Sequence, residues 1–123
     1  MKEKVIEYKI EKFVDFLGFI DNIENIYKNI DILFSSSELE GFCLPILESM
    51  ASGLPVISFD NKGIDDYFIH NVNGYIYKNE HDSLVYLKEL IDNKDLRIKM
   101  GKVNRVKAES YTWDKIGLLY LDY

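Results

Sequence analysis

Short apolar runs alternate with longer amphipathic stretches along the whole chain. The short runs are rich in β-branched and aromatic residues and are bounded by Gly, Pro, Asn or Ser, which is typical of β-strands. The pattern predicts four strands, at Phe13–Leu17, Asp31–Phe34, Pro55–Phe59 and Tyr75–Tyr77.

The stretches between these runs have the spacing of helices. Pro45 suits a first helical turn, where its missing N–H has no partner to lose, and Gly53 and Pro55 provide a stop downstream. Further along, apolar residues recur at intervals of three and four, as on the buried stripe of a helix. The pattern predicts helices at Glu3–Lys9, Ile23–Lys28, Leu44–Ser52, 81–92 and 95–109, and a last helix from Trp113 onward with Thr112 as its N-cap.

The alternation of strands and helices predicts an α/β fold. Short apolar strands separated by helices are typical of a parallel sheet that is covered on both faces, and we expect a Rossmann-like sheet of this kind. Such sheets bind ligands at the carboxyl ends of their strands. A binding site is therefore expected in the loops at residues 18–25, 35–43 and 59–66.

Composition narrows the classes of function. The chain has 123 residues, which is the size of one domain. Its net charge of −6 argues against binding nucleic acid, because phosphate contacts need clustered Lys and Arg. The lone cysteine, Cys43, forms no internal disulfide and favours a reducing compartment. Since no apolar run approaches the ~18 residues of a membrane span, we expect a cytoplasmic protein.

The segment 35–53 carries the most specific chemical signal. It leaves a predicted strand, forms a polar loop that contains Gly41, and enters the helix predicted to begin at Leu44. A helix N-terminus presents free N–H groups and a partial positive charge, which suit a phosphate. Glu40 and Glu48 bracket this helix start, and carboxylates suit sugar hydroxyls because they only accept hydrogen bonds. The segment therefore predicts a site shaped for a nucleotide sugar.

Simpler interpretations exist for the same residues. Glu40 and Glu48 could decorate a solvated helix start, where acidic side chains are favoured without any ligand. Cys43 has no histidine placed to activate it as a nucleophile. His70 and His81 are too few and too scattered to predict a metal site. We therefore predict neither a metal nor a cofactor.

Residues 40–48 resemble a known motif. Their sequence, Glu-Gly-Phe-Cys-Leu-Pro-Ile-Leu-Glu, is similar to the E-x7-E motif of the retaining, GT-B-fold glycosyltransferases of family 4, the glycosyl transferases group 1. The motif alone is weak, but five flanking segments resemble family signatures in the same order. These segments are Val14-Asp-Phe-Leu-Gly18, Asp31-Ile-Leu-Phe-Ser-Ser-Ser37, Met50-Ala-Ser-Gly-Leu-Pro-Val-Ile57, Asn73-Gly-Tyr-Ile-Tyr77 and Tyr111-Thr-Trp113.

The resemblance implies a role for each residue of the motif. Glu40 would contact hydroxyls of the donor sugar and serve as the catalytic residue, and Glu48 would accept hydrogen bonds from the ribose hydroxyls. The sugar and the diphosphate would lie along Gly41, Phe42, Cys43 and Leu44. Such enzymes keep the anomeric configuration and need no metal for the chemistry, because fixed positive groups stabilise the leaving charge.

The resemblance also implies a longer protein. The basic pair that clamps the diphosphate, two strands of the nucleotide domain and the acceptor-binding domain are expected upstream of Phe13–Leu17. Residues 1–123 would then be a single partial domain, the C-terminal portion of the donor-binding domain, and inactive alone. The complete enzyme would act on an unknown acceptor in glycan, lipid-linked oligosaccharide or polysaccharide biosynthesis, in the cytoplasm or at the inner face of the membrane.

One alternative to the partial-domain interpretation stays open. The chain could be a free-standing small α/β binding or interaction module without catalytic activity. If the chain is a partial domain, the predicted strands 13–17 and 31–35 lack their intervening neighbours, and exposed parallel edges invite pairing. We therefore expect either a homodimer formed through these edges or direct pairing of residues 13–17 beside residues 31–35.

Overall fold

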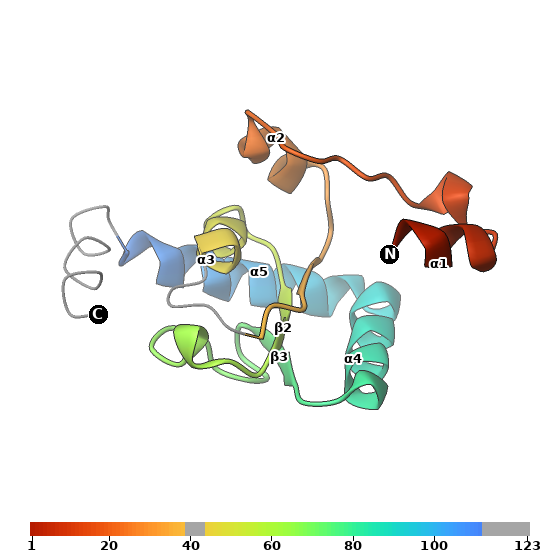
Figure 1. Ribbon diagram of the computed structural model, residues 1–123. Helices are drawn as coiled ribbons and strands as arrows, with labels where there is room; N and C mark the ends of the chain where they lie inside the picture. The colour runs from red at the N-terminus through yellow and green to blue at the C-terminus, as the bar shows by residue number, and fades with distance from the viewer. Residues whose placement is uncertain (39–43, 112–123) are drawn as a thin grey trace.

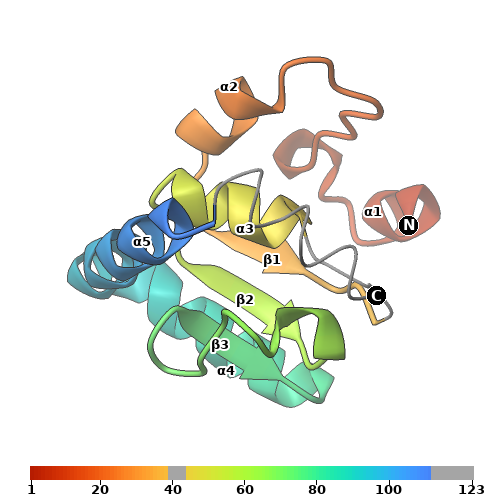
Figure 2. The same cartoon turned by 90° about the vertical axis from the view of Figure 1, so that its left-hand side faces the viewer.

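The computed structural model describes residues 1–38 and 44–111. At its centre lies a parallel sheet (Figure 2) made of three strands in the spatial order β1 (Leu33–Ser35), β2 (Val56–Phe59) and β3 (Gly74–Tyr77). In the register, Ile57 of β2 pairs with Phe34 on one side and Tyr75 on the other. Three of the four predicted strands are confirmed, and their carboxyl ends lie along one edge of the sheet.

Helices cover both faces of the sheet, as the α/β pattern predicts. The three longest in the described part of the chain are α3 (Leu44–Ala51), α4 (Glu80–Asp92) and α5 (Lys94–Glu109). Helix α3 packs on one face against β1 and β2, whereas α4 packs on the other against β2 and β3 (Figure 2). Helix α5 contacts both α3 and α4. Each helix differs from its predicted range by one residue at one end.

Asparagines cap the first turns of α4 and α5. The Asn79 side chain accepts a hydrogen bond from the Asp82 backbone N–H at 2.9 Å, and Asn93 accepts one from Leu96 at 3.0 Å. Each bond satisfies an N–H that has no partner inside its own helix. These caps explain why each helix begins one residue before the predicted start.

The core is divided between the two faces of the sheet. Val56 and Ile57 are adjacent in β2 and both fully buried, but they point to opposite faces because side chains alternate along a strand. Val56 packs with the α3 side chains Ile46, Leu47 and Met50. Ile57 packs with a second cluster made of Tyr75, Tyr77, Leu90 and Met100. Burial on both faces explains the continuous apolar runs seen in the sequence.

Helix α5 is fastened to the amino-terminal ends of β2 and β3. The fully buried Asn104 donates to the carbonyls of Leu54 and Asn73, both at 2.7 Å. Its side-chain oxygen accepts from the Asn73 side-chain amide at 2.9 Å. Close by, α5 approaches the end of α3 so tightly that a Cβ on Gly101 would lie 2.1 Å from the Gly53 carbonyl oxygen. The amino ends of β2 and β3 are thus held to α5 by buried hydrogen bonds.

The N-terminal segment lies apart from the sheet (Figure 1). It contains α1 (Lys2–Glu7), the 3-10 helix η1 (Glu11–Phe13) and α2 (Ile23–Lys28). The predicted strand Phe13–Leu17 is wrong, because Phe13 ends η1 and the following residues pair with no strand. The predicted helix Glu3–Lys9 ends earlier, at Glu7, and Lys9 has a positive φ of 56° that interrupts helical geometry.

The prediction that residues 13–17 pair beside β1 is also wrong. A strand needs a neighbour to hydrogen-bond with, and β1 pairs only with β2 among the described strands. Phe13, Leu17 and Phe19 are exposed, by 76%, 56% and 92% respectively. The apolar run was therefore recognisable in the sequence, but within residues 1–38 and 44–111 it pairs with no strand. Pairing with a second copy stays a prediction.

The short helix η2 (Lys62–Ile64) follows β2, and the Asn61 side chain caps it by accepting from the Gly63 backbone N–H at 2.9 Å. None of the helices within residues 1–38 and 44–111 is long and apolar enough to cross a membrane. The helix predicted from Trp113 onward lies outside the described residues.

Candidate functional site

A cavity of about 270 Å³ opens at the carboxyl end of β1. It is bordered by the end of the strand, by the serine loop that follows, and by the first turn of α3; its lining residues are Leu33, Phe34, Ser35, Ser36, Ser37, Pro45 and Ile46. This is the edge at which parallel α/β sheets bind their ligands. The loop 35–43 was expected to form a site, and its described part borders the cavity.

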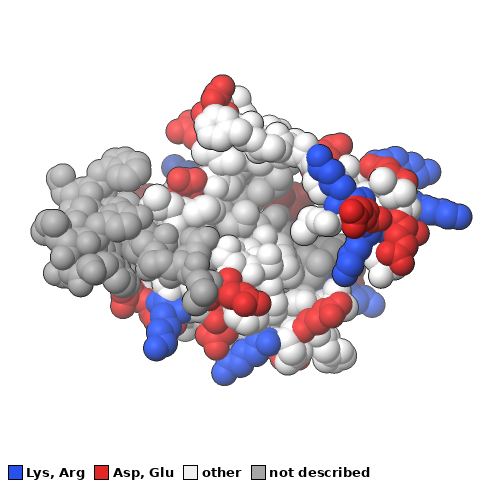
Figure 3. Space-filling view, viewed as in Figure 1, with Lys and Arg blue, Asp and Glu red and all other residues white. Residues whose placement is uncertain are grey.

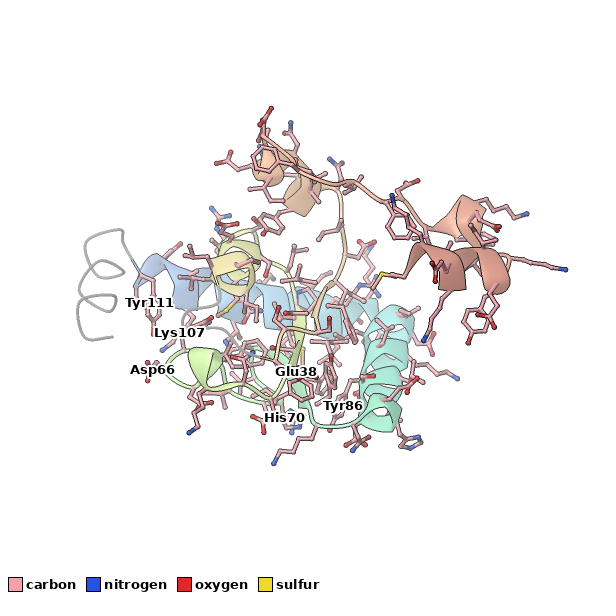
Figure 4. The ribbon with its side chains drawn as sticks, viewed as in Figure 1. Glu38, Asp66, His70, Tyr86, Lys107 and Tyr111 are labelled. Atoms are coloured by element: carbon pink, nitrogen blue, oxygen red, sulfur yellow. The ribbon has the colours of Figure 1, made fainter. Side chains whose placement is uncertain are left out.

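One side chain at the end of β3 and one from the loop after β2 hydrogen-bond to the serine loop. The Tyr77 hydroxyl at the end of β3 donates to the Ser35 carbonyl at 3.3 Å, and the Asn61 amide donates to the Ser37 carbonyl at 3.1 Å. Burial, followed by the negative charge of Glu38 (labelled in Figure 4), raises the pKa of Tyr77, so its hydroxyl remains a donor. The loop that leads toward Glu40 is therefore tied to the carboxyl ends of β2 and β3.

Helix α3 begins beside this cavity. Leu44 is half-buried and packs against the cluster around Ile46, which fixes the orientation of the first turn. The unpaired N–H groups of a first turn carry a partial positive charge, so an anion is favoured there. The predicted site residues Glu40, Gly41, Phe42 and Cys43 lie outside the described residues.

Glu48 lies on α3 one turn beyond this helix start and is exposed. Its Oε2 accepts a hydrogen bond from the hydroxyl of Tyr27, 3.0 Å away on α2. Tyr27 is only 6% exposed, and its hydroxyl also lies 3.5 Å from the Pro45 carbonyl. Burial is the main cause that raises the pKa of Tyr27, and the neighbouring Glu48 carboxylate raises it further. The hydroxyl therefore stays protonated and keeps donating.

A second, larger cavity of about 400 Å³ lies between α2, α3 and α5. It has a mixed polar and apolar lining, formed by Ile23, Glu24, Tyr27, Lys28, Glu48, Ala51, Ser52 and Arg105. Arg105 donates to the Ala51 carbonyl at 3.1 Å, which directs its guanidinium to the C-terminal end of α3. This cavity leaves the Glu48 carboxylate open to a ligand.

The sequence motif points to Glu48 but gives no sign of the contacts made by Tyr27, Asn61 and Tyr77. Tyr27 lies on a short helix with two isoleucines, Ile23 and Ile26, and a tyrosine in such a position is typical of ordinary packing. Its partner is 21 residues away in the sequence, so no local spacing connects the two. Asn61 follows the predicted strand that ends at Phe59, and Tyr77 is the last residue of another predicted strand, so their place at the carboxyl edge was the available signal.

His70 has a structural role in the described chain. Its Nδ1 accepts from the Ile76 backbone N–H at 2.9 Å, and its ring packs edge-on against Tyr75 and Tyr86 (Figure 4). Within residues 1–38 and 44–111, no three His, Cys, Asp or Glu side chains are grouped so that they could hold a metal ion. The face in Figure 3 carries acidic and basic side chains interspersed, with no continuous basic patch over its described residues.

The family model of the glycosyl transferases group 1 matches residues 1–107. The chain belongs to this family. A relative, an uncharacterized glycosyltransferase from Haemophilus influenzae, is 30% identical over 110 residues, which are 87% of this chain but only 31% of the relative. This group 1 chain therefore spans less than a third of that relative's length.

Solved structures place the group 1 chain in the C-terminal domain of such enzymes. It is similar to the C-terminal domain of a group 1 protein, LpcC from Francisella tularensis, with 27% identity and a TM-score of 0.77 over 89% of this chain and 58% of that one. It is also similar to Staphylococcus aureus TarM, solved with fondaparinux, α-GlcNAc-glycerol and UDP, with 26% identity and a TM-score of 0.86. That match covers 98% of this chain and 25% of TarM. The predicted fold class is confirmed.

Proposed function

We propose that this chain forms part of the donor-binding site of a retaining glycosyltransferase that transfers a sugar from a nucleotide-diphosphate sugar to an acceptor. The observation that carries the proposal is the position of Glu48. It lies one turn inside a helix whose first turn borders the cavity at the carboxyl end of β1. An elongated ligand could thus meet a helix N-terminus and an accessible carboxylate along the same helix.

The helix start suits the diphosphate. The N–H groups at the start of α3 lack partners within the helix, and the helix dipole favours negative charge at that end. Helix α3 has no basic residue of its own. We therefore propose that cations from elsewhere in the complete enzyme share the diphosphate, and that residues 1–123 alone, as a partial domain, are inactive.

The two glutamates of the motif suit the two polyhydroxyl ends of the donor. A carboxylate accepts hydrogen bonds only, so it can receive two neighbouring ribose hydroxyls at once. In this proposal Glu48 receives the ribose hydroxyls and Glu40 contacts the donor sugar at the reacting end. Gly41, Phe42, Cys43 and Leu44 then line the sugar and the diphosphate. The UDP named for the TarM structure makes a uridine nucleotide the first donor to test.

The proposal predicts different effects for the two glutamates. In the complete enzyme, Glu48→Gln should weaken nucleoside diphosphate binding by roughly tenfold or more, because a charged hydrogen bond contributes about 1.5–3 kcal/mol. Glu40→Gln should lower the rate of sugar transfer and leave nucleoside diphosphate affinity nearly unchanged, since the diphosphate product carries no sugar. Calorimetry with UDP, GDP and ADP, together with transfer assays, measures both quantities.

A matched control separates these effects from a general loss of negative charge. Glu109→Gln removes the same charge from the exposed end of α5, distant in sequence from the motif, and should change neither quantity. If Glu48→Gln and Glu40→Gln behave like Glu109→Gln, the glutamates do not contact the donor and the proposed site is wrong.

A further inference from the structure

Tyr27 connects the site to a helix outside the motif. Its hydroxyl crosses from α2 to α3 and donates to the Glu48 Oε2 atom at 3.0 Å. The ring is buried and the carboxylate that it reaches is exposed. A rigid donor inside the protein is thus joined to an acceptor that faces a cavity of about 400 Å³.

We propose that Tyr27 is a positioning residue that holds the Glu48 carboxylate in the orientation in which it receives the ribose hydroxyls of the donor. This inference rests on the proposed function, because it assigns Tyr27 a role only if Glu48 contacts the ribose. It adds a residue that lies outside the E-x7-E motif and 21 positions from Glu48.

The physical argument begins with the flexibility of glutamate. An exposed Glu side chain samples many rotamers, and fixing it on binding costs conformational entropy. The Tyr27 hydroxyl removes part of this freedom before the ligand arrives, because its own ring is immobilised by burial. Preorganisation of this kind raises affinity without adding any contact to the ligand.

The Tyr27 bond leaves Glu48 able to bind. A carboxylate offers about four lone-pair positions, and Tyr27 occupies one of them on Oε2. The Oε1 atom and the second lone pair of Oε2 remain for two hydroxyls. Because burial and the Glu48 charge both raise the pKa of Tyr27, its hydroxyl remains a donor throughout the physiological pH range.

Tyr27 also contacts the start of α3, where the diphosphate is proposed to bind. The hydroxyl lies 3.5 Å from the Pro45 carbonyl, in the first turn of the helix. Pro45 also borders the cavity at the carboxyl end of β1. One buried side chain therefore adjoins both the carboxylate and the helix turn on which the donor is proposed to lie.

The test is Tyr27→Phe in the complete enzyme, with a comparison of two probes. Calorimetry measures the affinity for a nucleoside diphosphate and for its 2′,3′-dideoxy counterpart, which lacks the ribose hydroxyls. We expect Tyr27→Phe to weaken binding of the normal nucleotide by about three- to tenfold and to leave binding of the dideoxy nucleotide unchanged. The ratio of the two affinities should fall accordingly, and the donor KM should rise with little change in kcat.

This ratio separates positioning from a structural role. Partial unfolding lowers the active fraction for both probes equally and leaves the ratio of the affinities unchanged. Tyr111→Phe is the matched control, since it removes a tyrosine hydroxyl that donates to the Asp66 carbonyl at 3.4 Å, far along the chain from Glu48 (Figure 4). It should preserve both affinities and their ratio.

The outcomes distinguish this inference from the proposed function. If Glu48→Gln keeps the full preference for the normal nucleotide, Glu48 does not contact the ribose and both ideas fail. If Glu48→Gln loses the preference but Tyr27→Phe keeps it, only the role of Tyr27 is wrong. When Tyr27→Phe is combined with Glu48→Gln, we expect no further loss of nucleoside diphosphate affinity beyond that of Glu48→Gln alone, because Tyr27 acts through Glu48.

Discussion

Replacing Gly74 with alanine is expected to lower the free energy of unfolding of the chain by about 4 kcal/mol or more. Gly74 opens β3 directly beside β2, with a φ of 155°. A Cβ at this position would lie 1.8 Å from the Val56 carbonyl oxygen, inside the backbone of the neighbouring strand. Strand β3 would have to move away from β2 or lose its first pairing. Because domains are stable by only about 5–15 kcal/mol, much of the native population should be lost.

Gly18→Ala provides the matched control for this prediction. Gly18 also has a positive φ, 62°, but a Cβ there meets no atom within 4 Å. Only the backbone preference of glycine is lost at Gly18, which lowers the free energy of unfolding by about 1–2 kcal/mol. Urea denaturation followed by circular dichroism measures both variants. Equal losses for Gly74→Ala and Gly18→Ala would show that the close approach of β2 and β3 is not as the structure describes.

Replacing Asn104 with alanine is expected to lower the free energy of unfolding by about 3 kcal/mol or more, which is the second-largest effect that we predict. The side chain donates to the Leu54 and Asn73 carbonyls and accepts from the Asn73 amide, all in a fully buried position. Alanine would leave these three polar groups without their partner, and each buried polar group that loses its hydrogen bond costs about 1–3 kcal/mol. Helix α5 would also lose its attachment to the amino ends of β2 and β3.

The control for Asn104 is Asn29→Ala. Asn29 also donates from its side chain to a backbone carbonyl, that of Asn25 at 2.7 Å, but this bond is exposed to solvent. Water can take the place of the missing side chain at an exposed hydrogen bond, so the free energy of unfolding should fall by less than about 1 kcal/mol. A shift in the denaturation midpoint for Asn104→Ala as small as that for Asn29→Ala would argue against the buried network.

The elements predicted correctly from the sequence are those specified by local signals. Helix α3 has Pro45 in its first turn and Gly53 just beyond its end, and both signals lie within the segment itself. Strands β2 and β3 are apolar runs that are buried by their own neighbours in this chain. Residues 13–17 have the same apolar pattern, but they pair with none of the described strands and form no strand themselves. Pattern alone predicts the tendency to form a strand and not the presence of its neighbour.

The residues of the candidate site also divide into those specified by local sequence signals and those that depend on contacts between distant residues. The start of α3 and Glu48 were predictable, because they follow from a helix boundary and a spacing of eight residues. Tyr27 and Asn61 were not, because their contacts with Glu48 and the serine loop depend on how distant loops and helices pack. Such contacts join residues more than 20 positions apart, for which a single sequence carries no spacing signal.

A crystal structure of the complete enzyme with its nucleotide-sugar donor tests the central claim most directly. The ribose hydroxyls should lie at about 2.5–3.0 Å from the Glu48 carboxylate oxygens, and the diphosphate should meet the first turn of α3. The Tyr27 hydroxyl should still donate to Oε2. Glu40 should contact the hydroxyls of the donor sugar. A donor bound at another edge of the sheet, with Glu48 facing only solvent and Tyr27, would contradict the proposed site.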